Sequence, residues 1–434
     1  MNILVITRNA WDDKNSIGNT ISNLFCAWED AKFLNLYFRE ASPQNEVCTQ
    51  YYQLSEKRLL KYFFRPSRMG RLFSTSSGGP VNGHAENSAM ESRIVRFSHR
   101  HPGGLAIKTA NCLWNTKRWI TPQFREVIEH FSPDVVFTFA KSEPQYYQSV
   151  RWIKQNTNAK VVLFLVDDVA AYYRSLSPKT GRRLLQDFES LMGLADRVYA
   201  VTEELRREYR AYSHDIGLLQ KGCFFTYPVK KTVDSPLSIL YAGNLLFGRD
   251  KTLAAIVQSL RRINDGQVRV CLHVFTGTEI SDKLCAQLDA GRTTILHGAQ
   301  DYKRLQLQMS TSDLVLHMES FDEADKCAVR YSFSTKLTDC MQSGSGLLAV
   351  GPADLASIRF TKQLRGAFVV DRLSDLDAAF RSILSNPKAL IESRDQIRAY
   401  ARDHFEARDG SRRLRAEFVE IASRPDGNEL IGRQ

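Results

Sequence analysis

Short apolar runs alternate with longer amphipathic stretches along most of the chain. The runs are rich in Val, Leu, Ile and Phe and are not broken by a polar residue at every second position, which is typical of parallel strands covered on both faces. The longer stretches repeat apolar residues at helical spacing. In the first half this pattern predicts strands at 3–7, 135–139, 161–166 and 198–201, with helices at 19–28, 124–131, 182–194 and 203–212.

A break in the pattern at 226–236 separates the two halves of the chain. Pro228 and Pro236 interrupt the alternation, and Lys230 and Lys231 lie between them. The alternation then starts again at residue 237. It predicts strands at 237–241, 268–275, 314–318, 347–350 and 367–370, with helices at 252–264, 281–290, 302–309, 336–342 and about 388–422.

Because alternating strands and helices predict a parallel sheet, we expect an α/β protein with two facing, Rossmann-like, doubly wound domains. Ligands of such sheets bind at the carboxyl ends of the strands. Two facing domains therefore imply an interdomain cleft formed by loops of both. The expected parts are a first domain at 1–225, a linker at 226–236, a second domain at 237–395 and a C-terminal helical segment at 396–434.

Length and composition agree with this picture. The 434 residues correspond to two or three domains of about 150 residues, and 43% hydrophobic with 25% charged residues excludes wholesale disorder. No apolar run approaches the roughly 18 residues of a membrane-spanning helix, and the first residues lack a secretory signal, so we expect a cytoplasmic protein. The eight cysteines form no Cys-x-x-Cys pair, so neither a disulfide framework nor structural zinc is expected.

The positive charge is concentrated in residues 51–125. This segment has thirteen basic and three acidic residues, which accounts for most of the formal charge of +11. Leu, Tyr and Phe alternate with the cations over 59–73. Such a basic and aromatic excursion suits an anionic membrane surface, but it also suits single-stranded nucleic acid or a solvated face around a local core.

The loop after the strand at 237–241 carries residues suited to phosphate. Gly243 frees the backbone, Asn244 follows it, and Arg249 and Lys251 place two cations at the start of the next helix. Cations at this position suit a diphosphate leaving group. The alternative is a basic loop in front of a capped helix.

A second set of polar residues follows the strand at 314–318. Glu319 ends that strand, and Lys336 and Asp339 are three residues apart on one face of the predicted helix at 336–342. An ammonium suits phosphate, and a carboxylate suits the vicinal hydroxyls of a ribose. The alternative for Lys336 and Asp339 is a surface ion pair.

The first half offers weaker candidates. Gly18 lies in the loop after the first strand, where backbone N–H groups at a helix start could meet a phosphate or sugar; a plain helix cap is the alternative. Asp167 and Asp168 end the strand at 161–166 and would face the cleft, where they could orient an acceptor or cap the following helix.

No metal site is expected. Asp375 and Asp377 form an Asp-x-Asp pattern of the kind that metal-dependent transferases use, but they open a helical stretch and are better explained as helix capping with favourable dipole charge. His317 lies in a strand-like run and is interpreted as a core residue. No cofactor is expected either.

In their order along the chain, these features resemble the GT-B glycosyltransferases of the retaining, family-4 type, which build bacterial capsule, lipopolysaccharide and exopolysaccharide glycans. The resemblance omits roughly residues 40–120. It rests on the Gly18 loop, the strand entry at 132–136, the segment at 195–198, the loop at 242–245 with Arg249 and Lys251, and the segment at 333–339 leading to Gly344.

The resemblance implies transfer of a sugar from a nucleotide-diphosphate sugar, bound by the second domain, to a glycan or lipid-linked glycan acceptor on the first. It implies retention without a metal, with a phosphate oxygen of the departing diphosphate accepting the acceptor's proton. It also implies a peripheral position at the inner face of a membrane. The resulting candidates are Arg249, Lys251 and Glu319 as catalytic residues; Gly18, Gly243, Asn244, Lys336 and Asp339 for the donor; and Asp167 and Asp168 for the acceptor.

The sequence also departs from the family. Asp339 stands where the family has a glutamate, and Tyr331 stands where it has another; Glu319 is expected to take over that polar contact. Two other functions remain open: a nucleotide-sugar epimerase or hydrolase of the same fold, and a non-enzymatic protein that binds through its basic surface. Nucleic acid is not an expected partner.

Overall fold

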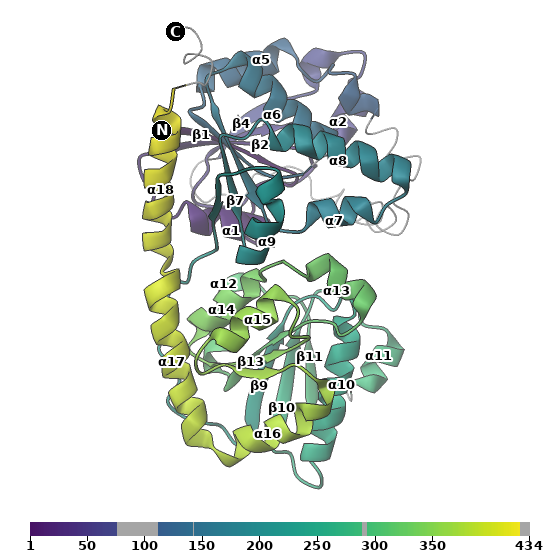
Figure 1. The fold of residues 1–434 in the computed structure, drawn as a ribbon, viewed down its shortest axis with the longest axis vertical. Coiled ribbons are helices and arrows are strands. Elements are labelled where there is room, and N and C mark those ends of the chain that lie inside the picture. Colours follow the sequence, from purple (N-terminus) through teal and green to yellow (C-terminus); the bar gives the residue numbers. More distant parts are fainter. Residues whose placement is uncertain (76–111, 142, 289–292, 426–434) are drawn as a thin grey trace. The chain divides into compact units, whose positions relative to one another are not determined.

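The computed structural model describes residues 1–75, 112–141, 143–288 and 293–425 (Figure 1). The chain divides into two compact units, which we call the first unit (Met1–Leu219 with Arg408–Gln434) and the second unit (Gln220–Ala407). The boundary therefore lies at Leu219, before the predicted linker at 226–236. The residues from Arg408 onward return to the first unit instead of forming a separate segment.

The first unit contains a sheet of eight strands in the order β4-β3-β2-β1-β5-β6-β7-β8. All neighbouring strands are parallel except β3 and β4, which are antiparallel. The predicted strands of this unit are present. The bounds are β1 (Asn2–Thr7), β2 (Lys32–Tyr37), β3 (Gln50–Gln53), β4 (Arg71–Ser74), β5 (Val135–Phe139), β6 (Lys160–Leu165), β7 (Arg197–Ala200) and β8 (Ile216–Leu218).

Helices connect these strands, and the C-terminal helix completes the first unit. Phe418 of α18 lies 5.1 Å from the ring of Trp28 and 6.1 Å from that of Phe137, and Trp28 donates a hydrogen bond to the backbone oxygen of Ser411. The helices are α1 (Ser16–Leu24), α2 (Glu56–Lys61), η1 (Pro66–Arg68), α5 (Pro122–Phe131), α6 (Pro144–Asn156), α7 (Val169–Arg174), α8 (Pro178–Met192), α9 (Glu203–Glu208), η3 (Tyr209–Ala211) and α18 (Ala407–Ser423).

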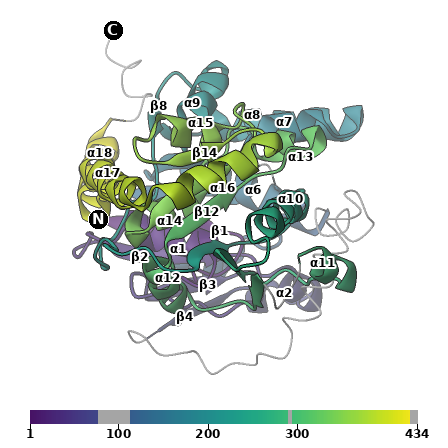
Figure 2. The same cartoon turned by 90° about the horizontal axis from the view of Figure 1, so that it is seen from below.

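The second unit contains a six-stranded parallel sheet in the order β11-β10-β9-β12-β13-β14. Helices α10 and α16 pack against each other, as do α12 and α14 (Figure 2). The strands are β9 (Leu237–Ala242), β10 (Val270–Phe275), β11 (Thr294–His297), β12 (Leu314–Met318), β13 (Gly346–Val350) and β14 (Phe368–Val370).

The core of the second unit lies between its sheet and α10 with α16. Leu253, Ile256 and Leu260 of α10 are buried in one cluster with Ile239 and Leu272 of the sheet. The helices of this unit are α10 (Arg249–Ile263), α11 (Asp282–Gln287), α12 (Tyr302–Thr311), α13 (Glu323–Val329), α14 (Thr335–Ser343), α15 (Ala356–Gln363), η4 (Leu373–Asp375), α16 (Leu376–Ser385) and α17 (Pro387–Phe405).

Each sheet has a point where the strand order reverses. β1 lies between β2 and β5, and β9 lies between β10 and β12, so the connections after neighbouring strands leave in opposite directions. Ligands of doubly wound sheets bind at such points, outside the carboxyl ends of the strands. The ends of β9 and β12 are therefore the natural place for a ligand in the second unit.

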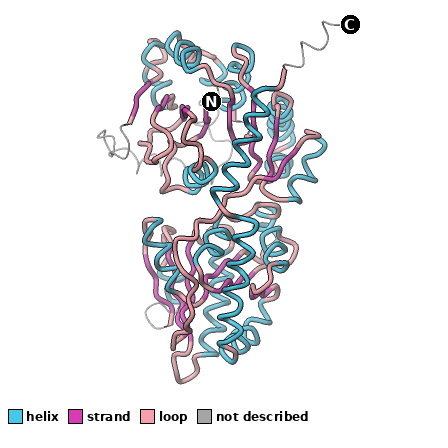
Figure 3. Tube along the Cα trace, turned by 90° about the vertical axis from the view of Figure 1, so that its left-hand side faces the viewer, coloured by secondary structure: helices cyan, strands magenta, loops and turns pink. Residues whose placement is uncertain are grey.

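Two predictions for the less regular parts need correction. The helical segment expected over about 388–422 is two helices, α17 and α18, separated at Glu406 and labelled in Figure 1. Figure 3 shows that both units contain helices and strands. The basic excursion was expected over 51–125. In its described first part, β3, α2 and β4 belong to the first unit, and both strands extend its sheet. Residues 76–111 lie outside the described residues. Within the described ranges, no helix is both long and apolar enough to cross a bilayer.

Candidate functional site

The loop between β9 and α10 packs tightly against the residues that follow β12. Phe247 and Gly248 both have left-handed backbone conformations, with φ of 54° and 68°. A side chain on Gly248 would collide with Ser320 and Asp325. Helix α10 then begins at Arg249. The first-turn N–H groups of this fifteen-residue helix therefore lie where the strand order of the second sheet reverses, which we call the switch point. Helix N-termini of this kind attract anions.

Arg249 is held in a buried ion pair by Glu319. Its Nη2 and Nε lie 2.7 and 3.0 Å from the same oxygen, Oε2 of Glu319. The side chains are 11% and 5% exposed. The remaining terminal nitrogen, Nη1, donates to Oδ1 of Asn244 at 2.9 Å. The guanidinium is thereby fixed between the loop after β9 and the end of β12.

His317 and Lys336 complete what we call the Arg249 cluster, which comprises Arg249, Glu319, His317 and Lys336. His317 is buried, and its Nε2 lies 3.8 Å from Oε1 of Glu319 without a hydrogen-bond partner in the described chain. Burial, reinforced by Arg249 and Lys336, lowers the pKa of His317 to about 3. The imidazole is therefore neutral at physiological pH.

Lys336 brings a second cation to the cluster from α14. Burial, reinforced by the charge of Arg249, lowers the pKa of Lys336 to about 8. Its ammonium occupies the space beside Gly243 that a side chain there would need. Among the described residues it has no ion-pair partner, and it lies 6.0 Å from the centre of the ring of Tyr241. Arg249 and Lys336 together form a site that can hold a dianion such as a diphosphate.

The carboxylate of Glu319 is influenced by both cations. Burial raises the pKa of Glu319, although the charge and the hydrogen bonds of Arg249 and the charge of Lys336 oppose the rise. Of the residues predicted from sequence, the structure thus brings together Gly243, Asn244, Arg249, Glu319 and Lys336.

Lys251 does not belong to this buried cluster. It lies in the first turn of α10, but its side chain is 70% exposed and is paired with Asp322. The pairing raises the pKa of Lys251.

Asp339 is part of a separate polar network. Its Oδ1 accepts hydrogen bonds from Lys221 at 2.6 Å and from the hydroxyl of Tyr302 at 2.7 Å. Gln342 donates to the same hydroxyl at 3.0 Å. The surface pair between Lys336 and Asp339 that sequence left open is thus absent from the described contacts. Sequence reasoning missed Lys221 and Tyr302, because neither lies at a recognisable motif.

The three candidates of the first unit are engaged in local structure. The N–H of Gly18 donates to the cap residue Asn15 at 2.8 Å, and a side chain on Gly18 would collide with the backbone of Asp12. Asp168 caps α7 by accepting from the N–H of Ala171 at 3.0 Å, and it also accepts from the hydroxyl of Tyr209 at 2.9 Å. Asp167 immediately precedes it, and its backbone oxygen accepts from Val169.

Both aspartates of the Asp-x-Asp pattern accept hydrogen bonds from arginines. Asp377 accepts from Arg262 at 2.7 Å and from Ser259 at 2.5 Å. Asp375 occupies the predicted N-cap position of α16, with Asp377 in the first turn, but its side chain makes no bond to the helix and accepts from Arg372 at 3.1 Å. In the part of the chain that the structure describes, no three His, Cys, Asp or Glu residues are grouped as metal ligands.

No protein-family model and no curated protein matches the sequence. Solved structures do match. Sucrose-phosphate synthase from Thermosynechococcus elongatus aligns over 97% of this chain and 99% of its own, with 13% identity and a TM-score of 0.60. HepE from Anabaena in complex with UDP and glucose aligns over 97% and 100%, with 9% identity and a TM-score of 0.61. WaaG, a glycosyltransferase involved in lipopolysaccharide biosynthesis, aligns over 95% and 98%, with 11% identity and a TM-score of 0.58.

At such low identity, the likeness concerns the fold. The matched structures are GT-B proteins with two Rossmann-like domains, and the two sheets described above have the parallel, doubly wound order that this fold requires. The fold predicted from the sequence is confirmed: the chain has the GT-B fold.

Proposed function

We propose that the protein is a glycosyltransferase that moves a sugar from a nucleotide-diphosphate sugar to a glycan or lipid-linked glycan acceptor. The observation that carries the proposal is the pair of cations, Arg249 and Lys336, at the switch point of the second sheet. The structure of HepE with UDP and glucose supports a donor of this class.

In this proposal the cations stabilise the leaving group. The diphosphate lies against the first turn of α10, and Arg249 and Lys336 offset the charge that grows on it as the sugar bond breaks. Preorganised charges of this kind contribute several kcal/mol to catalysis. Asp339, oriented through Oδ1 by Lys221 and Tyr302, accepts the ribose hydroxyls. We propose transfer with retention and without a metal, as the family resemblance implies.

The acceptor is assigned to the first unit. We propose that Asp167 and Asp168 at the end of β6 orient it. A hollow of about 430 Å³ lies next to α7, the helix that Asp168 caps. Its lining comes from α7 and α8 and includes Tyr173, Arg174, Gly181 and Arg182.

Thermal unfolding in the presence of UDP, GDP, ADP and CMP tests the donor site. Ligand at 100 times its dissociation constant adds about 2.7 kcal/mol. We expect one nucleotide to raise the midpoint by several degrees, and Lys336→Met to abolish the rise. Because Lys336 has no ionic partner in the described chain, this variant should fold. Lys231→Met, at an exposed pair with Asp395, is the matched control.

The same experiment can contradict the proposal. A folded protein that no nucleotide stabilises would favour the non-enzymatic function. Product analysis with the nucleotide sugar, with and without added acceptor, then separates transfer from the alternative chemistry. Turnover that needs no acceptor would favour the epimerase or hydrolase.

We further propose that the protein associates peripherally with the inner face of a membrane. The supporting feature is the basic surface of α2 to β4, which follows the carboxyl end of β3. Leu60, Phe64 and Leu72 are 62%, 87% and 48% exposed there. The exposed cations around them are Lys57, Lys61, Arg65, Arg68 and Arg71, and no acidic residue interrupts 57–74.

This combination matches an anionic bilayer. Each cation contributes about 1 kcal/mol near such a surface, and exposed aromatic side chains settle among the headgroups. One neighbouring arginine has another role: the guanidinium of Arg58 donates to the backbone oxygens of Arg68, Met69 and Gly70 and so holds the surface in shape.

Vesicle sedimentation tests the membrane proposal. We expect binding to phosphatidylcholine vesicles only when they contain phosphatidylglycerol, and at least tenfold weaker binding for Leu60→Ser with Phe64→Ser. Val419→Ser, which changes a 48% exposed residue on α18, is the control. Equal binding by all three proteins would exclude this surface, and tighter binding to single-stranded RNA than to vesicles would favour the nucleic-acid alternative.

A further inference from the structure

Among the described contacts, the hydrogen bonds to the buried carboxylate of Glu319 fall on one of its two oxygens. Oε2 accepts both hydrogen bonds from Arg249, whereas Oε1 faces Nε2 of His317 at 3.8 Å, which is too long for a hydrogen bond. The other charged or titratable groups around the carboxylate are Lys336 of α14 and Tyr241 of β9.

The guanidinium is equally committed to Glu319. Nε and Nη2 both bond Glu319, and Nη1 bonds Asn244, so three of the five N–H donors are in use. A diphosphate could grip the guanidinium through Nε and Nη2, one of the two bidentate sides of an arginine, only by replacing Glu319. The side chain of Asn244 is a neutral amide and can stay beside a phosphate. The carboxylate of Glu319 would repel the phosphate.

We propose that Glu319 is a built-in counter-ion that holds Arg249 while the donor site is empty, and that the donor's diphosphate takes Arg249 from it on binding. This inference rests on the proposed function. It assigns Glu319 a role in donor binding, different from the sugar contact that the sequence resemblance suggested.

A proton accompanies the exchange. Once the diphosphate holds Arg249, Glu319 is left beside new negative charge in a buried place, and its neutral form is favoured. The proton comes from solvent and goes to the freed carboxylate. Burial already raises the pKa of Glu319 in the empty site, and the loss of Arg249 would shift it in the same direction.

Calorimetric titration of Glu319→Gln tests the proposal with UDP and inorganic pyrophosphate as probes. Gln keeps one oxygen for Arg249 but removes the competing charge. We expect both probes to bind at least fivefold more tightly to Glu319→Gln than to the wild type. Asp371→Asn is the matched control, because it removes a carboxylate that follows a strand of the same sheet, β14, but pairs with Lys362; its affinities should stay within twofold of the wild type.

Proton uptake gives a second readout that uses only the wild type. A nucleotide-diphosphate sugar has no phosphate group that titrates between about pH 5 and 8, because both of its phosphates are esterified. At about pH 6.5, where Lys336 is already charged, its binding heat should depend on the ionisation enthalpy of the buffer. A heat that is the same in phosphate and Tris buffers would overturn the proposal even if Glu319→Gln failed to fold.

The outcomes separate this inference from the function it rests on. If the wild type binds UDP and Glu319→Gln binds it equally or more weakly, the counter-ion role is overturned and donor binding stands. If Glu319→Gln loses affinity only for the UDP-sugar, Glu319 is a sugar contact instead. If neither protein binds any nucleotide, both proposals fail together.

Discussion

Strand β12 of the second unit is flanked by one buried carboxylate at each end. Asp313 precedes its first residue and Glu319 follows its last, and each carboxylate faces an arginine from a distant helix: Arg394 of α17 for Asp313, Arg249 of α10 for Glu319. The two pairs are alike in composition. They differ in how completely the carboxylate is bonded.

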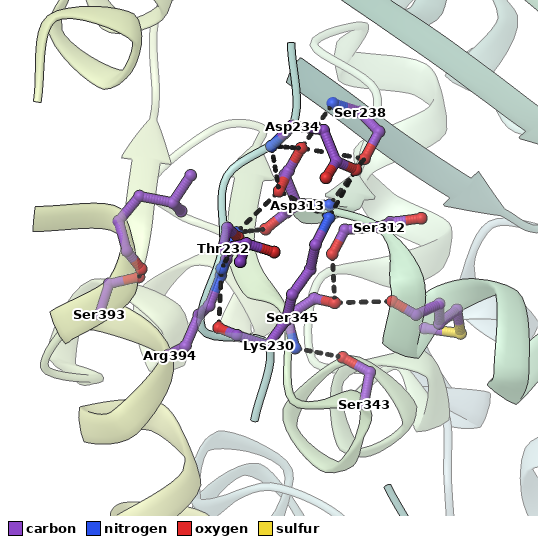
Figure 4. A network of polar contacts seen from close by, with 12 residues as sticks. Lys230, Thr232, Asp234, Ser238, Ser312, Asp313, Ser343, Ser345, Ser393 and Arg394 are labelled. Carbon is purple, nitrogen blue, oxygen red and sulfur yellow. Dashed lines mark hydrogen bonds and ion pairs between the residues drawn. The ribbon is translucent and has the colours of Figure 1, made fainter. Parts of the chain in front are cut away.

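Asp313 is saturated with hydrogen bonds (Figure 4). Arg394 lies 3.0 Å from Oδ1 and Lys230 2.8 Å from the same oxygen, while the N–H and hydroxyl of Ser238 reach Oδ2 at 2.9 and 3.1 Å. Arg394 also donates to the backbone oxygen of Thr232 at 2.7 Å. This network fastens 230–238 and α17 to the amino edge of the sheet.

The surroundings shift the pKa values of Asp313 and Glu319 in opposite directions. Burial would raise the pKa of Asp313, but the hydrogen bonds from Lys230 and from the backbone N–H of Ser238 outweigh it and hold the pKa below its usual range. For Glu319 burial prevails and the pKa is raised. We infer from the comparison that the pair with described bonds to both carboxylate oxygens holds the fold, whereas the pair whose described bonds fall on one oxygen is open to exchange. Glu319 lies at the carboxyl edge of the sheet and Asp313 at its amino edge. This agrees with the general rule that doubly wound sheets bind ligands at their carboxyl edge.

The largest effect should come from breaking the saturated pair. Asp313→Asn leaves Arg394, whose side chain is 0% exposed, as an uncompensated buried charge, and we expect a loss of about 3–5 kcal/mol in the free energy of unfolding. Urea denaturation measures it. Asp395→Asn, at the exposed pair with Lys231, should cost less than about 0.5 kcal/mol. A cost below 1 kcal/mol for Asp313→Asn would remove the structural half of the comparison.

The next largest effect concerns nucleotide affinity, which should depend on pH through the charge of Lys336 at the carboxyl edge of the second sheet. The ammonium of Lys336 is present below its pKa of about 8 and is lost above it, so nucleotide affinity should fall about tenfold for each pH unit above 8. Titrations from pH 7 to 10 measure the fall, and Lys336→Arg, which stays charged, should flatten it. An equally steep fall in Lys336→Arg would mean that another group controls the affinity.

Stability of the empty protein should change with pH in the opposite direction. The pKa of Lys336 is lower in the folded protein than its ordinary value of 10.5, so between these values the unfolded chain binds more protons than the folded one. Stability therefore rises with pH across this window. The rise should be absent in Lys336→Met, and denaturant midpoints at pH 8 and 10 provide the check.

A smaller effect is expected when one bond of the saturated network is removed. Ser238→Ala deletes a hydroxyl that donates to Asp313 at 3.1 Å but leaves the other bonds to the carboxylate. We expect a loss of about 1 kcal/mol, measured by urea denaturation. A loss as large as that of Asp313→Asn would show that the network has no redundancy.

The smallest effect on stability should come from Glu319→Gln. The described bonds of the carboxylate all come from Arg249, and the amide keeps an acceptor for it, so we expect a loss of less than about 1 kcal/mol, far below the cost of the same type of change at Asp313. Parallel denaturation of the two variants sharpens the comparison most directly. Equal costs would mean that both pairs are structural.

Much of this arrangement could be predicted from the chain. The strands at 135–139 and 314–318 coincide with β5 and β12, because their apolar runs are uninterrupted. Arg249, Glu319 and Lys336 were found because cations and carboxylates at strand ends and helix starts have few structural uses. Their contact depends on β9 lying beside β12, which is a long-range pairing that no local pattern contains.

Other parts could not be predicted, for identifiable reasons. β2 was missed because Asn35 interrupts its apolar run; the amide is nevertheless buried, bonded to Trp11, Val5 and Thr7. β11 is a four-residue edge strand with half its residues polar. Asp313 has no signature, since an aspartate before a strand is usually a turn residue.

The packing of Phe418 on Trp28 and Phe137 has a consequence for the order of synthesis. The first unit contains a piece of core that lies beyond the whole second unit in the chain. A ribosome must therefore finish the second unit before the aromatic side chains of the first are covered. During that time the apolar surface of the nascent first unit stays exposed to solvent. The second unit can therefore complete its core before the first unit does.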